Sequence, residues 1–367
     1  MPVALRHRER ELDAVARLGS DEFVLLVHKA DAPGAEATAR RVIEAMSRPF
    51  RLDGTEFTVT CSIGVALCPA DGDNLDQLMR RADAAMHGVK ESGRASFRFH
   101  RPGDAGAPRS QMQLDHAMRQ ALVSGQFRLH YQPQIDLGTG AIVGAEALIR
   151  WRDPELGDVA PGEFIPVAED SGFIVPIGDW VLAQAVRQAA DWHRRGLAMP
   201  VSVNVSALQF QQAGFVDRVA AALEQARLPA RLLELELTES ILVRDAEEAL
   251  LRLQALAQLG VRLAIDDFGT GYSSLAYLKR FPIEKLKIDR SFVKGLPADD
   301  SDAGIVKAII QMARALGLKV IAEGVETEAQ RRFLVQSGCD EFQGFLHAPA
   351  LDFASFEQRL ERATAGA

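Results

Sequence analysis

The sequence predicts an α/β protein in which a barrel of alternating strands and helices follows a smaller α+β module. Two observations support this fold class. Hydrophobic, strand-like runs alternate with helical patterns at a spacing of roughly 30 residues through the C-terminal two-thirds of the chain, which is typical of a parallel βα barrel. A polar residue also stands at the end of each expected strand, and in such a barrel these ends share one mouth.

The composition is that of a globular protein with room for two domains. The chain has 367 residues, of which 47% are hydrophobic and 25% charged, and its net charge is −8. This acidic balance lacks the basic signature of proteins that bind polymeric nucleic acid. The three cysteines form neither a CxxC pair nor a metal-ligand spacing, so we expect reduced thiols in a cytoplasmic protein. No apolar run reaches the roughly 18 residues of a membrane span, and the N-terminus lacks a secretory signal.

A segment rich in proline, glycine and alanine divides the chain. It covers residues 101–108 and has no hydrophobic period, which favours a linker. We therefore expect a first domain over residues 1–100, a linker over 101–110 and a second domain over 111–367.

The first hundred residues predict alternating short strands and helices. RLGSDEFVLLV predicts a strand, a turn and a strand, and TEFTVTCSIGVAL predicts one strand. Helices are expected over residues 35–46 and 74–93, the second ended by Gly93. A further helix, over residues 110–125, introduces the barrel.

The polar residues at the expected strand ends suit a divalent-metal site. They are Glu146, Asn204, Glu236, the pair Asp266 and Asp267, Lys287, Glu323, Glu326 and Gln343. Mg²⁺ and Mn²⁺ prefer carboxylate and amide oxygens, and the first four residues supply that mixture. Two adjacent carboxylates repel each other unless a metal neutralises them, so the Asp pair predicts two cations.

The same residues suggest hydrolysis of a phosphate ester. Lys287 would orient a water or neutralise the phosphate, and Glu323 would ligate the second metal and help deprotonate the water. Each residue alone also fits an ordinary structural role, such as a solvated strand-end Glu, a turn-forming Asp pair or a solvent-facing Lys. Their coincidence at successive strand ends favours the metal site.

A glycine-containing loop follows the Asp pair in DDFGTGYSSL, and Glu239 lies three residues past Glu236. The loop is expected either to move beside the metals or to form a tight turn before a capped helix. Glu239 is placed to accept hydrogen bonds from this loop, and a simple helix cap fits it equally well.

From about residue 111 to the end, the sequence resembles the EAL domain, the cyclic di-GMP phosphodiesterase family. The matching segments are YQP, EALIRW, FIPVAEDSG, NVSALQF, ELTES, DDFGTGYSSL, LKIDRSFV and VIAEGVE. The resemblance implies a TIM-like (β/α)8 barrel whose first strand runs antiparallel to the rest. It also implies hydrolysis of cyclic di-GMP to linear pGpG with two divalent ions, Mg²⁺ or Mn²⁺, and a homodimer through the barrel.

The resemblance also assigns roles to individual residues. Metal ligands would be Glu146, Asn204, Glu236, Asp266, Asp267 and Glu323. Catalytic roles would fall to Lys287, Glu323, Asp267 and the loop anchor Glu239. Substrate contacts or site support would come from Arg150, Gln132, Glu326 and Gln343. One departure follows Gln343, where Phe345 and His347 stand in place of the more usual Tyr and Phe, which affects the expected fit of the substrate.

The first hundred residues resemble the C-terminal part of a GGDEF domain, the diguanylate cyclase family. GSDEF at residues 19–23 stands where GGDEF would, and Arg10 with Asp13 has the spacing of an RxxD inhibitory site. The front of that domain, with its first strand and a metal-binding Asp, is missing from the match. We therefore expect a partial, degenerate module without cyclase activity. For Arg10 and Asp13, an exposed helix end is favoured over a working inhibitory site.

Three other functions remain open from the sequence. The chain could be a non-catalytic cyclic di-GMP receptor, a bifunctional cyclase and phosphodiesterase, or a barrel hydrolase acting on another phosphodiester. The complete set of metal and catalytic residues favours the phosphodiesterase. We expect a cytoplasmic protein with no membrane segment in this chain, and tethering through an upstream region stays open.

Overall fold

The computed structural model describes residues 14–17, 23–48, 50–52, 55–57, 60–91, 96–101, 111–239, 241, 246–269 and 278–365. The chain separates into two compact units, residues 1–117 and 118–367. The division falls within α3 (Gln111–Ser124), the helix expected to introduce the barrel. Among the described helices, none combines the length and the apolarity needed to cross a lipid bilayer.

The first unit contains short strands and two longer helices. In chain order these are β1 (Ala14–Arg17), β2 (Phe23–Leu26), α1 (Ala32–Met46), β3 (Phe50–Leu52), β4 (Thr55–Phe57), β5 (Ile63–Val65), α2 (Leu75–Glu91) and β6 (Phe97–Phe99). β1 pairs with β2 and β3 with β4, both antiparallel, whereas β5 and β6 are parallel.

Two residues of this unit, Asp31 and Gly64, show how the sequence determines its local structure. The side chain of Asp31 accepts a hydrogen bond from the backbone N–H of Gly34 and so caps α1. At Gly64 on β5, an added Cβ would lie 1.7 Å from the backbone oxygen of Ala82, so only glycine allows α2 to pack this closely.

Both expected helices are present. Of the expected strand–turn–strand, β2 and the end of β1 at Arg17 are present as paired strands, and the expected turn, residues 18–22, lies outside the described residues. The single strand expected for TEFTVTCSIGVAL is wrong, because β4 and β5 are separate strands with different partners. A continuous strand-like pattern in the sequence does not reveal where a chain changes its pairing partner. Gly93, expected to end the second helix, lies outside the described residues.

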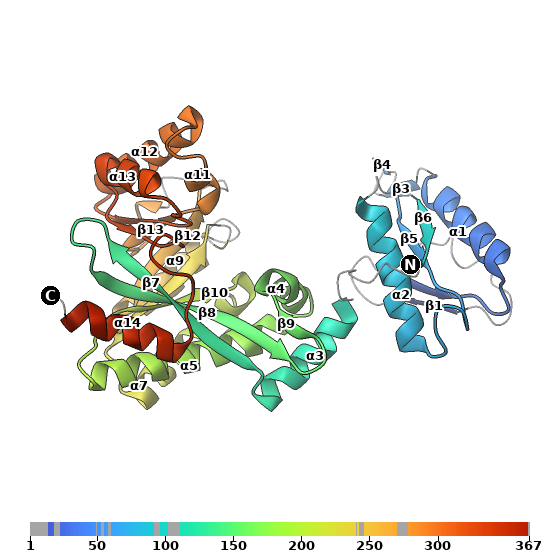
Figure 1. Cartoon of the computed structure of the whole chain (residues 1–367), viewed down its shortest axis with the longest axis horizontal. Helices are drawn as coiled ribbons and strands as arrows, with labels where there is room; N and C mark the ends of the chain where they lie inside the picture. Colours follow the sequence, from blue (N-terminus) through green and yellow to red (C-terminus); the bar gives the residue numbers. More distant parts are fainter. Residues whose placement is uncertain are drawn as a thin grey trace. The chain divides into compact units, whose positions relative to one another are not determined.

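The second unit is a closed barrel of eight strands (Figure 1). The strands are β7 (Phe127–Asp136), β8 (Ile142–Asp153), β10 (Val201–Val205), β11 (Leu233–Thr238), β12 (Arg262–Phe268), β13 (Lys285–Ile288), β14 (Lys319–Ala322) and β15 (Glu341–Phe342). Pairing of β8 with β10 closes the ring, and the short β9 (Gly157–Val159) extends β8 as a hairpin.

The direction of β7 departs from the all-parallel barrel expected from periodicity. β7 pairs antiparallel with β8 and with β15, whereas the other barrel pairs are parallel. A hairpin of residues 137–141 connects β7 to β8, too short for the crossover that parallel neighbours need. The antiparallel first strand implied by the family resemblance is therefore confirmed.

Helices surround the barrel strands (Figure 1). They are α4 (Pro161–Asp170), α5 (Ile174–Arg194), α6 (Ala207–Phe210), α7 (Phe215–Ala226), the 3-10 turn η2 (Ala230–Leu232), α9 (Ala246–Gln258), α11 (Arg290–Lys294), α12 (Asp300–Ala315), α13 (Glu328–Ser337) and α14 (Phe353–Ala365). The outward-facing strand residues, such as Val203, Leu235 and Leu286, are buried against them and form the apolar core.

The inward-facing strand residues are largely polar, which is unusual for such a barrel. They form two levels, because side chains two residues apart on a strand share a face. The first level contains the predicted site. The second level, which we call the lower polar layer, consists of Gln134, Ser202, Glu234, Lys285 and Glu341, all of them buried.

The C-terminal helix α14 is held to the barrel by aromatic side chains. Phe356 is fully buried, with its ring centroid 5.2 Å from that of Trp192 and 5.9 Å from that of Tyr131. Glu357 accepts hydrogen bonds from the indole N–H of Trp192 and from Arg195. These contacts tie the end of the barrel unit to α5 and to its first strand, β7.

Truncation of Phe356 to alanine should therefore destabilise the barrel by about 3–5 kcal/mol, the usual cost of removing a buried aromatic ring. Denaturant unfolding measures the loss. Leu251→Ala on α9 is the control, because this side chain is 67% exposed and should change stability by less than about 0.5 kcal/mol. Equal effects of the two substitutions would contradict the packing described for α14.

Candidate active site

A single buried lysine lies at the centre of the predicted site. The Nζ atom of Lys287 is 2.6 Å from Glu236 and 2.6 Å from Glu323. It is 3.1 Å from Asp266 and 3.5 Å from Glu146. Four carboxylates from four different strands or strand ends therefore converge on one ammonium group.

Two amide side chains fix the orientation of Glu146. Asn204 donates to its Oε1 at 2.6 Å, and Gln343 donates to its Oε2 at 2.5 Å. Gln343 also donates to Oε1 of Gln132 at 2.9 Å, and Gln132 donates to the backbone oxygen of Ala348. The amides thus connect Glu146, through Gln132, to the segment that leads into α14.

Asp266 and Asp267 differ in backbone conformation and in partners. Asp267 has φ +54°, a left-handed conformation that is uncommon for residues other than glycine, and its backbone N–H donates to Oδ1 of Asp266 at 2.9 Å. Its side chain shares a hydrogen bond with Asp289. Carboxylate oxygens of Asp266, Asp267 and Glu323 lie within 4.8 Å of one another, which is close enough for a shared cation.

Burial and crowding of negative charge dominate the electrostatics. Burial would lower the pKa of Lys287, but the surrounding carboxylates outweigh it and hold that pKa well above its usual range. Burial raises the pKa of Glu236 well above its usual range, and Glu146 raises it further. Burial, with smaller contributions from Asp266 and Glu146, also raises the pKa of Glu323 to about 8.

Glu146 differs from its neighbours. Burial would raise its pKa, but the charge of Lys287 and the hydrogen bonds from Gln343 and Asn204 outweigh burial and lower it. For Asp267, burial and the neighbouring charges of Asp266 and Asp289 raise the pKa to about 6. The site therefore holds more protons than isolated carboxyl groups would, which is a sign of unbalanced negative charge.

The residues fit divalent cations. Oε1 of Glu236 is buried and receives no hydrogen bond from the described part of the chain, so it is free to ligate. One lysine does not balance the charge of Glu146, Glu236, Asp266, Asp267 and Glu323. A hard cation such as Mg²⁺ or Mn²⁺ would complete both the ligation and the charge balance.

Glu239 lies beside the loop after β12, as the sequence suggested. It is 3% exposed, and its Oε2 accepts a hydrogen bond from the backbone N–H of Gly269 at 3.2 Å. Residues 270–277 of the loop lie outside the described part of the chain.

The remaining predicted residues are less closely tied to the cluster. Arg150 is half-buried on β8, four residues past Glu146, and its Nη1 donates to the backbone oxygen of Ile149. Glu326 is exposed, and its backbone N–H donates to Gln330. Arg10 and Asp13 lie outside the described residues.

Sequence reasoning missed two groups. Asp289 contacts Asp267, and its position two residues past Lys287 on the same face was the available signal. The lower polar layer was also missed, because Ser202, Glu234 and Lys285 were not separated from ordinary strand residues.

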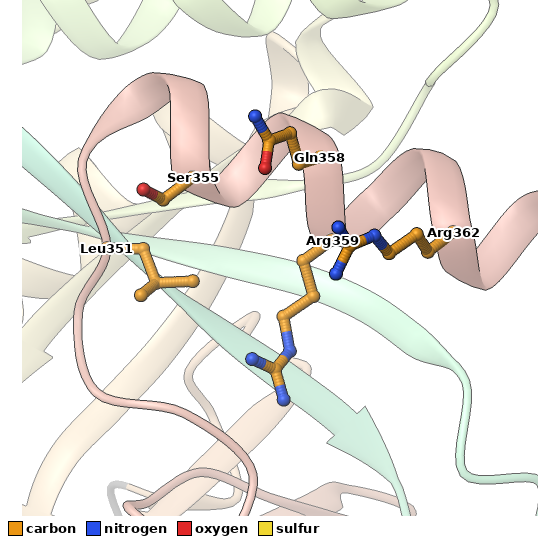
Figure 2. Close-up of a pocket in the computed structure, with 5 residues that line it drawn as sticks. All are labelled: Leu351, Ser355, Gln358, Arg359 and Arg362. Carbon is orange, nitrogen blue, oxygen red and sulfur yellow. The ribbon is translucent and has the colours of Figure 1, made fainter.

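One surface cavity of about 370 Å³ lies along α14, lined by Leu351, Ser355, Gln358, Arg359 and Arg362 (Figure 2). It contains none of the predicted site residues. Arg359, labelled in Figure 2, donates to the backbone oxygen of His347 at 2.7 Å.

Two protein-family models match the chain. The EAL domain model matches residues 115–350, more than half of the chain and all of the carboxylate cluster. The chain belongs to the EAL domain family. The model of the diguanylate cyclase GGDEF domain matches residues 3–96, so both resemblances drawn from the sequence are confirmed.

Two curated relatives match nearly the whole of this chain. Over 93% of its length this chain is 47% identical to the bifunctional diguanylate cyclase/cyclic di-GMP phosphodiesterase MucR of Pseudomonas aeruginosa, covering 50% of MucR. Over 95% of its length it is 39% identical to the cyclic di-GMP phosphodiesterase PdeR of Escherichia coli, covering 52% of PdeR. The chain therefore spans about half the length of these curated relatives.

A solved structure supports the barrel of the EAL domain. It is the MucR phosphodiesterase in complex with c-di-GMP, 49% identical with a TM-score of 0.65. The match covers 66% of this chain and 99% of that one. The TIM-like barrel of this chain is thus similar to that of a solved phosphodiesterase structure.

Metal affinity of this EAL domain should rise with pH. Divalent ions compete with protons for Asp267 and Glu323, whose pKa values are raised to about 6 and about 8. The apparent affinity for Mg²⁺ should therefore increase as pH rises from 6 to 8, as calorimetry would show. Glu323→Gln removes the carboxyl group whose pKa is raised to about 8 and should flatten the upper part of the curve. An affinity independent of pH across this range would contradict the assignment.

Proposed function

We propose that this EAL domain hydrolyses one phosphodiester bond of cyclic di-GMP and releases linear pGpG. The observation that carries the proposal is the convergence on Lys287 of four carboxylates, from β8, β11, β12 and the end of β14. The c-di-GMP in the MucR complex supports the choice of substrate. The names of MucR and PdeR as phosphodiesterases support the reaction.

Two divalent ions, Mg²⁺ or Mn²⁺, are proposed to be held by Glu146, Asn204, Glu236, Asp266, Asp267 and Glu323. When bound, such ions neutralise phosphate charge and make water more acidic. For Asn204, ligation requires the amide oxygen, and its amide nitrogen already faces Glu146 at 2.6 Å. This orientation leaves the oxygen available to a cation.

Side chains of the protein would bind the attacking water, accept its proton and contact the substrate. Lys287 Nζ holds the attacking water and offsets negative charge, and Glu323 at 2.6 Å from it accepts a proton. Arg150 contacts a substrate phosphate, assisted by Gln132, Gln343 and Glu326. Glu239 keeps the loop after β12 beside the cluster through Gly269.

The test is chromatography of cyclic di-GMP after incubation with the purified chain and Mg²⁺, Mn²⁺ or EDTA. Metal-dependent pGpG supports the proposal. Unchanged nucleotide together with binding by calorimetry would instead support a non-catalytic receptor, and turnover that survives EDTA would remove the metal role. Competition by other cyclic phosphodiesters distinguishes a barrel hydrolase of different specificity.

For the GGDEF unit we propose a regulatory or structural role, so GTP should remain unchanged in the same assay. Formation of cyclic di-GMP from GTP would show a bifunctional protein instead. We also propose a homodimer through the barrel, as the family resemblance implies, and light scattering of the purified chain tests it.

A further inference from the structure

The lower polar layer contains a second buried lysine with its own carboxylate partners. Lys285 Nζ lies 2.9 Å from Glu341 and 3.2 Å from Glu234. The side chains of Lys285, Glu234 and Glu341 are only 9%, 1% and 4% exposed. A buried ion cluster this far from solvent is costly unless its geometry is well satisfied.

The two remaining members of the layer, Gln134 and Ser202, provide hydrogen-bond partners for Lys285 and Glu234 and complete a ring of hydrogen bonds. Ser202 donates to Oε1 of Glu234 at 2.7 Å, and Gln134 donates to Ser202 at 3.2 Å. Lys285 in turn donates to Oε1 of Gln134 at 3.4 Å and to Glu234 at 3.2 Å. The absence of a side chain at Gly144 makes room, since a Cβ there would lie 2.5 Å from Oε1 of Gln134.

Each member of the layer lies two residues from a predicted site residue on the same face of the same strand, with Gln343 one residue past the end of β15. The pairs are Ser202 with Asn204, Glu234 with Glu236, Lys285 with Lys287, Glu341 with Gln343, and Gln134 with Gln132. The ring therefore links β7, β10, β11 and β13 directly below the side chains that surround Lys287, and Glu341 adds β15.

We propose that Lys285 is a positioning residue for the carboxylate site. Its contacts fix the separation of the strands that carry Glu236, Lys287 and Gln343, and thereby the spacing of the metal ligands. Loss of the ammonium group leaves Glu234 without its ionic partner and leaves Glu341 paired only with Lys319, 3.3 Å away, so the two buried carboxylates repel and the strands above them shift. Misplacement of ligands should weaken metal binding and turnover more than substrate binding.

This proposal rests on the proposed function only for its turnover readout. The test compares Lys285→Met with Leu286→Ala, the neighbouring residue on β13. Leu286 is fully buried but faces the helices, so its truncation destabilises the barrel without touching the layer. For each variant we would measure the melting temperature, the Mn²⁺ affinity by calorimetry, and kcat and KM for cyclic di-GMP.

At a temperature where both variants are folded, Lys285→Met should lose at least about tenfold in Mn²⁺ affinity and in kcat, with KM changed less than about threefold. Leu286→Ala should keep both within about twofold of the parent. The triple variant Lys285→Met, Glu234→Gln, Glu341→Gln removes the uncompensated charges and should recover part of the lost kcat. Equal losses in Lys285→Met and Leu286→Ala would overturn the proposal.

Ser202→Ala is measured in parallel. It removes the hydroxyl group that links Gln134 to Glu234 but keeps the Lys285 ammonium group beside the buried carboxylates, so this variant should fold even if Lys285→Met does not. It should lower Mn²⁺ affinity by about threefold to tenfold, whereas unchanged affinity in a folded Ser202→Ala would overturn the proposal. The metal readout also separates the two hypotheses. If the parent chain binds Mn²⁺ but does not hydrolyse cyclic di-GMP, the proposed function is wrong. The positioning role of Lys285 is then judged from the Mn²⁺ affinities of the variants alone.

Discussion

Replacing Lys287 with methionine should sharply destabilise the metal-free barrel. The substitution removes the ammonium group that lies within 3.5 Å of Glu146, Glu236, Asp266 and Glu323, and leaves these carboxylates to repel one another in a buried site. Breaking a buried ion cluster in this way costs about 3–5 kcal/mol. Chemical denaturation in EDTA measures the loss, and turnover should fall below detection.

Divalent ions should reverse much of this destabilisation. If the carboxylates are metal ligands, Mn²⁺ should raise the melting temperature of Lys287→Met more than that of the parent, because the cation replaces the missing charge. Lys294→Met, an exposed lysine on α11, provides the control and should leave melting and turnover near parental values. A Lys287→Met protein as stable as the parent in EDTA would show that Lys287 does not balance the cluster.

Glu146→Gln should abolish most turnover while leaving the fold intact. The amide keeps the size of the side chain and its hydrogen bond with Gln343 or Asn204, but it removes the charge that a divalent cation requires. We expect a decrease in kcat of at least about a hundredfold, in line with the several kcal/mol that a metal contributes to such reactions. Chromatography of pGpG measures the rate, and calorimetry measures the retained cyclic di-GMP binding.

The matched control is Glu357→Gln on α14, a carboxylate with 14% of its side chain exposed that contacts Trp192 instead of the cluster. It should hydrolyse cyclic di-GMP at close to the parental rate. Parental turnover by Glu146→Gln would disprove the metal assignment.

The candidate site could be predicted because the ends of strands can be recognised from the sequence pattern. Asp266 closes the apolar run LAI, whereas Glu236 and Lys287 lie in the alternating runs LELELT and EKLKID near the ends of their strands. The barrel geometry brings such strand ends to one mouth. Burial, and the arrangement of the carboxylates around Lys287, required the structure. No pattern in the sequence indicates which charged group lies at the centre of a cluster.

Other features of the fold could not be predicted from the hydrophobic periodicity of the sequence. The antiparallel direction of β7 depends on a hairpin of residues 137–141, and only the family resemblance implied it. The lower polar layer was missed because the interior of such a barrel is usually filled by apolar side chains. Charged residues such as Glu234 and Lys285 were therefore not expected inside it. The break between β4 and β5 depends on a change of partner, because β4 pairs with the adjacent β3, whereas β5 pairs with β6, which is distant in the sequence.

The pairing of the first barrel strand with the last has a consequence for synthesis on the ribosome. Asp136 of β7 lies opposite Glu341 of β15, so the cylinder cannot be completed until nearly the whole unit has been translated. About 200 residues separate the two strands, which takes roughly 10–40 s at ordinary elongation rates. During that interval the nascent chain carries unpaired strand edges, a state that chaperones commonly protect. Expression of this protein should therefore respond to slower translation or lower temperature more than that of a helical bundle of equal length.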